Sequence, residues 1–390
     1  MNITNNQIKI GAILSYITMA ISIVIGVFTT PLIINALGSS EYGVYVLFGS
    51  LIATLTLFDL GLNNTIVRYI SRYQADKQIT KQKYFLTHIT LVYILISLLV
   101  LGIGFYLYLN LGELFSSLTS NELIIAEKIF VILVVSLAIS LPGGMYTAIA
   151  NAYERFVFVR SINLVKLLIR TIFLLLILKF DASAYLIVLM DLFLTILTIF
   201  IMFGYCYRRL KVRFIWCVIS PKLLREIFGY SGWIFLLAIY QQIQWESGKL
   251  ILGNTSGTHS VTVYALGVML ALYYSGLATT ILGMYLPKAN QIASQEGSKN
   301  LSMDVGKQIS DYIFTILLPV IIAFYFFGEE FINLWLGPEF ENVYFITIVI
   351  MVLYLPALMQ GFMSSVLEAN KKVAIKSIIL ISSAIFGMIL

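Results

Sequence analysis

Long apolar runs with few charges recur along the whole of this 390-residue chain. A helix that spans a bilayer needs about 20 mostly apolar residues, and runs of that length fill most of the sequence. Hydrophobic residues make up 60% of the chain and charged residues 11%, whereas soluble domains carry about 25% charged residues. The chain is therefore predicted to be an all-α polytopic membrane protein. Soluble, disordered, collagenous and disulfide-scaffold classes are excluded.

We predict ten complete spans and an eleventh that begins near Val373 and is still running at Leu390. The first follows the N-terminus directly and is much longer than the apolar core of a cleavable signal, so it is expected to remain in the protein. The complete spans are placed at 8–36, 42–63, 84–109, 123–149, 158–178, 183–206, 227–252, 260–286, 308–328 and 343–367.

Basic residues mark one face of the predicted bundle. Twenty of the 25 Lys and Arg residues fall on the side of the N-terminus, whereas Lys179 lies on the other side with acids such as Glu41 and Glu113. This partition predicts a cytoplasmic N-terminus in a bacterial inner membrane. The net charge of +6 thus reflects topology, and no nucleic-acid partner is expected.

The two longest inner loops, 64–83 and 207–226, are basic and amphipathic. They are expected to lie in the headgroup layer, either as ordinary topology anchors or as a docking surface for an anionic lipid-linked substrate. Cys206 and Cys217 lie in or beside the second loop, on the cytoplasmic side, where a structural disulfide is not expected.

An internal repeat divides the chain. Two sets of residues match later sets at offsets of 219 and 214: Gly38, Val44, Tyr45 and Leu47 with Gly257, Val263, Tyr264 and Leu266, and Pro142, Met145 and Glu154 with Pro356, Met359 and Glu368. Two six-helix lobes are expected, at 1–206 and 227–390, joined by the basic linker 207–226. The second lobe would close about 30 residues beyond Leu390, so we expect a truncated chain with about 11 of 12 helices.

Residues 37–71, LGSSEYGVYVLFGSLIATLTLFDLGLNNTIVRYIS, resemble the opening of polysaccharide-biosynthesis membrane proteins. These are the Wzx-type oligosaccharide flippases of the multidrug/oligosaccharidyl-lipid/polysaccharide exporter superfamily. Further matching elements are Pro142, the AYERF segment at 152–156, the loop from Pro221 to Tyr230, the segment 263–267 and Pro287.

The resemblance implies a MATE-like fold of two six-helix bundles around a central cavity. It also implies movement of undecaprenyl-pyrophosphate-linked oligosaccharide, such as an O-antigen or capsule repeat unit, from the inner to the outer leaflet. Membrane lipid and polysaccharide polymerase machinery are then the expected partners. The same motif also has a structural interpretation, in which its glycines lie at helix ends and Glu41 helps to cap the second helix after Ser39 or Ser40.

Charges inside the predicted membrane region are candidates for function because each is costly there. Asn163, Lys166 and Arg170 form one polar stripe on the fifth span, with Arg170 roughly 15 Å deep. One hypothesis is that Lys166 and Arg170 contact the pyrophosphate or acidic sugars of the substrate. The alternative is that they form ion pairs with helix-borne acids such as Asp191, which is also a candidate for ion coupling.

A second polar stripe on the seventh span contains Gln242, Glu246 and Lys249, with Trp245 beside it. Glu246 and Lys249 could neutralise each other. The stripe could instead line the cavity, with Gln242, Trp245 and Lys249 at the substrate and Glu246 carrying a proton or acting with Na⁺.

Three further sites have simpler interpretations. Asp59 shares a helix face with Thr56 and Asn63; we expect it to pair with Arg68, with ion coupling as the alternative. His88 and His259 lack neighbours at metal-ligand spacing, so no metal site is expected.

No glycine-rich phosphate loop, HExxH motif or nucleophile elbow is found, and no inner loop is long enough for a nucleotide domain. We expect a transporter that is not an enzyme and has no cofactor. The alternatives are an ion-coupled drug or small-molecule antiporter of the same superfamily and a surface-polysaccharide polymerase or ligase. The short outer loops argue against the second alternative.

Overall fold

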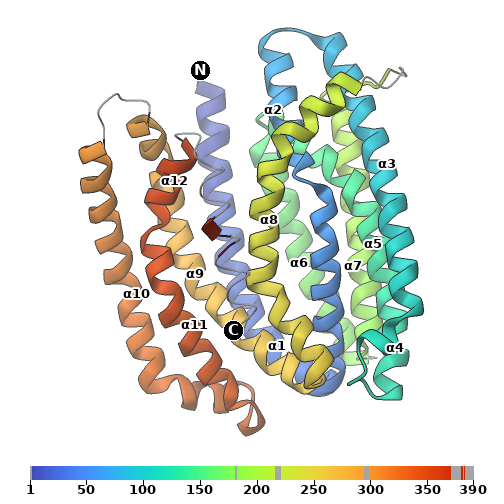
Figure 1. The fold of residues 1–390 in the computed structure, drawn as a ribbon, viewed down its shortest axis with the longest axis vertical. Coiled ribbons are helices and arrows are strands. Elements are labelled where there is room, and N and C mark those ends of the chain that lie inside the picture. Colours follow the sequence, from blue (N-terminus) through green and yellow to red (C-terminus); the bar gives the residue numbers. More distant parts are fainter. Residues whose placement is uncertain are drawn as a thin grey trace. The chain divides into compact units, whose positions relative to one another are not determined.

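The computed structural model describes residues 2–180, 182–215, 221–293, 299–369, 379, 380 and 382. These residues form an all-helical protein without strands (Figure 1). Eight of the described segments are long and apolar enough to cross a membrane, which confirms the predicted class. The helices are α1 (Asn2–Leu55), α2 (Leu62–Ala75), α3 (Ile79–Leu109), α4 (Leu111–Leu114), α5 (Ser120–Ala152), α6 (Phe156–Phe180), α7 (Ala184–Arg208), α8 (Pro221–Thr255), α9 (Thr258–Ala293), α10 (Lys299–Trp335), α11 (Asn342–Met359) and α12 (Gly361–Ala369).

The chain divides into two compact units, and α8 contributes to both of them. Unit 1 comprises Met1–Gln242 and Leu250–Thr258, and unit 2 comprises Ile243–Lys249 and His259–Leu390. The lobe boundaries at 206 and 227 stay a prediction.

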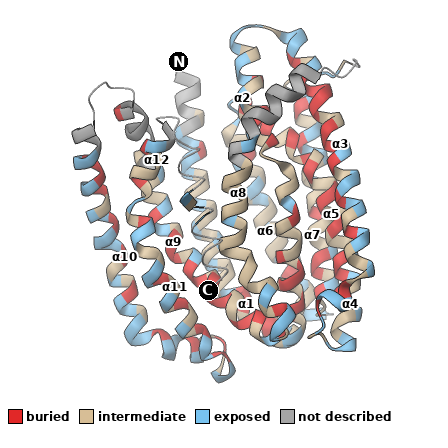
Figure 2. Ribbon diagram, in the orientation of Figure 1, coloured by how far each residue is buried: buried red, intermediate tan, exposed pale blue. Residues whose placement is uncertain are grey.

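In unit 1, α5 is the central helix and packs against α1, α2, α3 and α7. Its core is built from apolar residues of α2, α3 and α5, and Figure 2 shows the buried positions along α3 and α5 in red. Phe85, Leu86 and Tyr93 of α3 are fully buried in it. Many other large apolar side chains of these helices are exposed, as expected where lipid replaces water as the solvent.

The segment predicted as the loop 64–83 is instead largely helical. Ile66 and Ile70 of α2 are fully buried in the core of unit 1, whereas Arg68 and Arg72 on its other face are exposed. The apolar face of α2 thus packs on protein, and the position of this segment in the headgroup layer stays a prediction, now resting on its exposed basic face. Periodicity reveals an apolar face but not what covers it.

The second basic segment also begins in contact with protein. Val212 is buried in the same core, and the hydroxyl of Thr87 donates a hydrogen bond to the carbonyl of Ile215 at 2.8 Å. Trp216 and Cys217 lie outside the described residues, whereas Cys206 is a buried free thiol.

Unit 2 has its own core, formed where α10 packs against α11 and α12 and continued by α9. Ile309, Ile313 and Leu317 follow each other at four-residue spacing on α10 and are buried, as an apolar helix face requires. Phe362 of α12 fills the same core.

Two backbone breaks bear on the predicted helix boundaries. α1 consists of two helical stretches that meet at a kink at Gly38, with φ 79° and ψ 161°, which lies between the predicted first and second spans. The second span ends at Leu55, not at residue 63, because Leu60 and Gly61 are both left-handed. Gly257, which the repeat pairs with Gly38, has a φ of 81°. Both matched glycines therefore adopt a left-handed φ that L-residues with a side chain rarely accept.

Candidate substrate site

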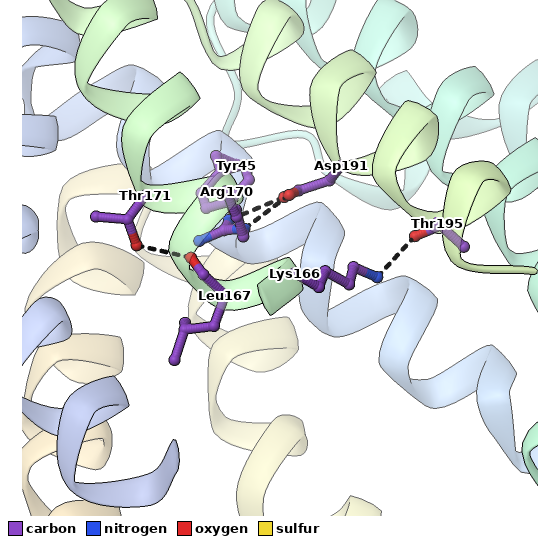
Figure 3. A network of polar contacts seen from close by, with 7 residues as sticks. All are labelled: Tyr45, Lys166, Leu167, Arg170, Thr171, Asp191 and Thr195. Atoms are coloured by element: carbon purple, nitrogen blue, oxygen red, sulfur yellow. Dashed lines mark hydrogen bonds and ion pairs between the residues drawn. The ribbon is translucent and has the colours of Figure 1, made fainter. Parts of the chain in front are cut away.

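A forked ion pair joins α6 to α7 within unit 1 (Figure 3). Arg170 Nε donates to Asp191 Oδ1 at 2.7 Å, and Arg170 Nη2 donates to Asp191 Oδ2 at 2.9 Å. The same Nη2 reaches the hydroxyl of Tyr45 on α1 at 3.4 Å. Both charged side chains are about one-third exposed, at 33% and 32%. The predicted alternative for Arg170, an ion pair with Asp191, is therefore formed in this structure.

Lys166 lies one turn before Arg170 and has a weaker contact. Its Nζ donates to the hydroxyl of Thr195 at 3.3 Å, and Thr195 lies one turn after Asp191 on α7. Because α6 and α7 run antiparallel side by side, the residue four positions before Arg170 on α6 lies opposite the residue four positions after Asp191 on α7. Asn163, the third member of the predicted stripe, is exposed.

Glu41 of α1 caps a different helix, α7. Its Oε1 accepts a hydrogen bond from the backbone N–H of Ala184 at 2.7 Å and so satisfies the first turn of α7. Ser183 occupies the N-cap position of α7, but its side chain makes no capping hydrogen bond. The helical stretch after the kink at Gly38 places Glu41 in its first turn, so the predicted role of Glu41 at the start of the second helix stays a prediction beside the observed cap of α7.

A second carboxylate, Glu122, lies at the same end of unit 1 and was not among the predicted site residues. Glu122 forms a capping box with Thr119 and also accepts hydrogen bonds from the hydroxyls of Ser40 and Thr258. A Cβ added to Gly43 would lie 2.2 Å from the carbonyl oxygen of Thr258, so a glycine is required for this close approach. The pattern T-x-x-E at residues 119–122 is a sequence signal for the capping box. The contacts of Glu122 with Ser40 and Thr258 join distant parts of the chain, so no local sequence pattern predicts them.

Asp59 has different partners from the predicted one. Its Oδ1 accepts hydrogen bonds from Asn63 Nδ2 at 2.9 Å and from the hydroxyl of Tyr93 at 2.8 Å. No ion pair joins it to Arg68 within the described ranges. The prediction failed because Tyr93 comes from α3, which lies beside Asp59 only in the folded chain.

The stripe on α8 contains an internal ion pair. Lys249 Nζ contacts Glu246 Oε2 one turn away, and both side chains are largely buried. Gly248 allows the ring of Tyr264 from α9 to pack closely beside this pair. Trp245 packs edge-on against Tyr354, with ring centroids 5.2 Å apart.

Gln242, the first residue of that stripe, belongs to unit 1. Its amide reaches the hydroxyl of Thr54 at 3.5 Å.

The two histidines, for which no metal site was expected, make ordinary contacts. His88 Nδ1 is 2.7 Å from the carbonyl oxygen of Tyr84, and His259 lies near the ring of Phe340. Among the described residues, no group of three or more His, Cys, Asp or Glu side chains is arranged to hold a metal.

The fold is that of MATE-like transporters. The Vibrio cholerae MATE transporter VcmN matches with a TM-score of 0.66 at 15% identity, covering 97% of this chain and 87% of its own. The Lipid II flippase MurJ, in an inward closed conformation, matches with a TM-score of 0.65 at 16% identity, covering 97% and 80%. An inward-facing multidrug MATE transporter gives 0.69 at 13% identity, covering 89% and 82%. This protein is a multi-pass membrane protein with that fold.

The sequence specifies the family. Residues 11–288 match the family described as "Polysaccharide biosynthesis protein", and the chain belongs to that family. A curated relative is the "Uncharacterized membrane protein EpsK" of Bacillus subtilis (strain 168), which is 22% identical over 336 residues. The match covers 83% of this chain and 64% of that protein, so the chain spans less than two thirds of this relative's length.

Proposed function

We propose that this protein translocates undecaprenyl-pyrophosphate-linked oligosaccharide, such as an O-antigen, capsule or other surface-polysaccharide repeat unit, from the cytoplasmic to the outer leaflet. Its family and its likeness to a Lipid II flippase support a lipid-linked substrate. The one-sided distribution of Lys and Arg supports a bacterial inner membrane location with a cytoplasmic N-terminus. Alternating access between the two units would expose the substrate site to each side in turn.

The observation that carries this proposal is the forked ion pair between Arg170 and Asp191. A guanidinium that binds one carboxylate with two parallel hydrogen bonds has the geometry to bind a phosphate in the same way. In the proposed mechanism, pyrophosphate oxygens replace Asp191 at Arg170. Lys166 adds a second cation one turn away, because the neutral hydroxyl of Thr195 does not satisfy its charge. Asn163 extends this surface toward the sugar.

The exchange suggests how substrate binding is coupled to an ion. Once Arg170 binds the substrate, Asp191 loses its counterion, and a half-buried carboxylate without a counterion gains from binding H⁺ or Na⁺. Glu246 has an equivalent role in unit 2, where Lys249 is its present counterion and becomes available to the substrate. Gln242 and Trp245 contact sugar, and Asp59 is a further coupling candidate. Polysaccharide polymerase machinery is the proposed partner that receives the exported unit.

The decisive experiment is depletion of the protein followed by assay of undecaprenyl-linked repeat units in each leaflet. Accumulation in the inner leaflet supports the proposal, and the absence of accumulation would remove it.

Variants are then expressed in the depleted cells to test the site. The double variant Lys166→Ala/Arg170→Ala should lose export while remaining folded and inserted. Arg160→Ala is the matched control, because it removes an exposed cation from the same helix.

The second candidate is an ion-coupled small-molecule or drug antiporter. The MATE transporters of the same fold, together with the acids Asp191 and Glu246, favour it. The cations Lys166 and Arg170 on α6 favour an anionic substrate instead. Cells that lose drug resistance on depletion, with normal repeat-unit export, would support the antiporter. The polymerase or ligase alternative is less well supported, because the fold is shared with transporters and a flippase and the predicted outer loops are short.

A further inference from the structure

A polar pocket of about 680 Å³ lies in unit 1, away from the forked ion pair. Its volume is in the range of small-molecule sites, which is about 300–1,000 Å³. The pocket combines one acidic and one basic side chain with two hydroxyl-bearing residues. It is lined by Glu41, Ile125, Lys128, Ala182, Ser183 and Tyr185.

The polar groups of this pocket have capacity left for a ligand. Lys128 is exposed and forms no ion pair with a described residue. Glu41 uses Oε1 to accept from Ala184, so its second oxygen is left for another donor. Because Glu41 replaces the Ser183 side chain as the cap of α7, the Ser183 hydroxyl also makes no capping bond. The pocket thus offers cationic, anionic and hydroxyl groups together.

The surroundings of the pocket are apolar. Ile124, one turn before Lys128 on α5, is 52% exposed, and Phe180 at the end of α6 is 79% exposed. Tyr185 is partly exposed at the pocket itself, and tyrosine is enriched at the membrane–water interface. A ligand in this position therefore has a zwitterionic polar part and an apolar part that lies in the bilayer.

We propose that the Glu41–Lys128 pocket binds the headgroup of a phosphatidylethanolamine-type lipid. The phosphate accepts hydrogen bonds from Lys128 and Ser183, and the primary ammonium donates to the free oxygen of Glu41. The acyl chains extend along the exposed side chains of Ile124 and Phe180. Because the pocket has a basic side chain, Lys128, and an acidic one, Glu41, it favours a zwitterionic lipid over an anionic lipid. An anionic lipid would place its phosphate near Lys128 but would offer no positive group to Glu41.

The test uses the full chain in detergent, titrated with phosphatidylethanolamine, phosphatidylglycerol or phosphatidylcholine and followed by native mass spectrometry. We expect phosphatidylethanolamine to bind roughly tenfold more tightly than either other lipid, the equivalent of one charge-assisted hydrogen bond. Equal binding of all three lipids would overturn the proposal without any need for a variant.

Two variants test the roles of Lys128 and Glu41 in lipid binding. Lys128→Met should weaken phosphatidylethanolamine binding roughly tenfold, whereas the control Lys81→Met, which removes an exposed lysine of α3, should leave it unchanged. Glu41→Gln should abolish the preference over phosphatidylglycerol while keeping the cap, since the amide oxygen still accepts from Ala184. An unaltered preference in Glu41→Gln, or equal binding by Lys128→Met and Lys81→Met, contradicts the assignment. An unchanged melting temperature in each variant shows that the fold is intact.

Discussion

The two units each hold a buried or half-buried ion pair, but the pairs are built differently. In unit 1, Arg170 and Asp191 are 21 residues apart and connect α6 to α7. In unit 2, Glu246 and Lys249 are three residues apart on the single helix α8. The two tyrosines that the predicted repeat matches each lie next to one pair: Tyr45 reaches Arg170, and Tyr264 packs beside Gly248, between the two charged residues of α8.

A pair within one helix and a pair between two helices can have different structural roles. The pair on α8 forms within one turn and neutralises its own helix, so it makes few demands on the neighbouring helices. The pair between α6 and α7 fixes the axial position of one helix against the other. It also uses a forked guanidinium, which an incoming phosphate can take over from Asp191. We therefore expect unit 1 to be the more sensitive to loss of charge.

The largest effect is expected from Arg170→Ala. Transport should fall at least about a hundredfold, the effect expected for loss of a bidentate charged contact of about 3 kcal/mol. Stability should fall by about 2 kcal/mol, less than for a fully buried pair, because Asp191 keeps some contact with solvent. Repeat-unit export in cells and thermal unfolding in detergent measure the two effects.

The charge-reversed double variant Arg170→Asp/Asp191→Arg separates the two roles of this pair. It restores an ion pair between α6 and α7, so stability should return toward that of the native protein. Transport should remain lost, because the cation then lies on α7 and no longer in line with Lys166. Recovery of both properties would show that Arg170 acts only through the structure.

A smaller effect is expected from Glu246→Gln/Lys249→Met in unit 2. Replacing both charges of a buried pair with neutral side chains of similar size is often neutral, so stability should change by no more than about 1 kcal/mol. Transport should persist but lose its dependence on an ion gradient, as measured by export after the gradient is collapsed. Undiminished dependence would assign the coupling elsewhere, with Asp191 as the next candidate.

The smallest effects are expected at the matched tyrosines. Tyr45→Phe removes one long hydrogen bond to Arg170, which is worth about 0.5–1.5 kcal/mol at most. Tyr264→Phe should cost less, because the Tyr264 hydroxyl lies beside Gly248 but forms no hydrogen bond with a described residue. Thermal unfolding of the two variants compares them directly. A larger loss for Tyr264→Phe would reverse the proposed ranking of the units.

Most of the helices could be predicted because composition and length suffice to recognise a span. The predicted span 158–178 corresponds to α6 at Phe156–Phe180, and 183–206 corresponds to α7 at Ala184–Arg208. The stripe containing Lys166 and Arg170 also followed from helical periodicity, and it correctly offered Asp191 as a partner.

Contacts between distant segments could not be predicted. Tyr93 reaches Asp59 across 34 residues, Glu41 reaches Ala184 across 143, and Thr258 reaches Glu122 across 136. Each depends on which faces of two helices meet. The sequence reveals an apolar or polar face but not its neighbour, which is also why the packing of α2 on the core of unit 1 could not be predicted.

The cap that α1 provides to α7 has a consequence for how the chain is assembled. A chain is made from its N-terminus, so Glu41 is already in place when residue 184 leaves the ribosome. The first amide of α7 therefore meets a preformed acceptor at the depth where that helix must start. In this way an early helix sets the register of a later one, and a shift of α7 by a single residue would leave that amide without its acceptor in a poorly hydrated setting.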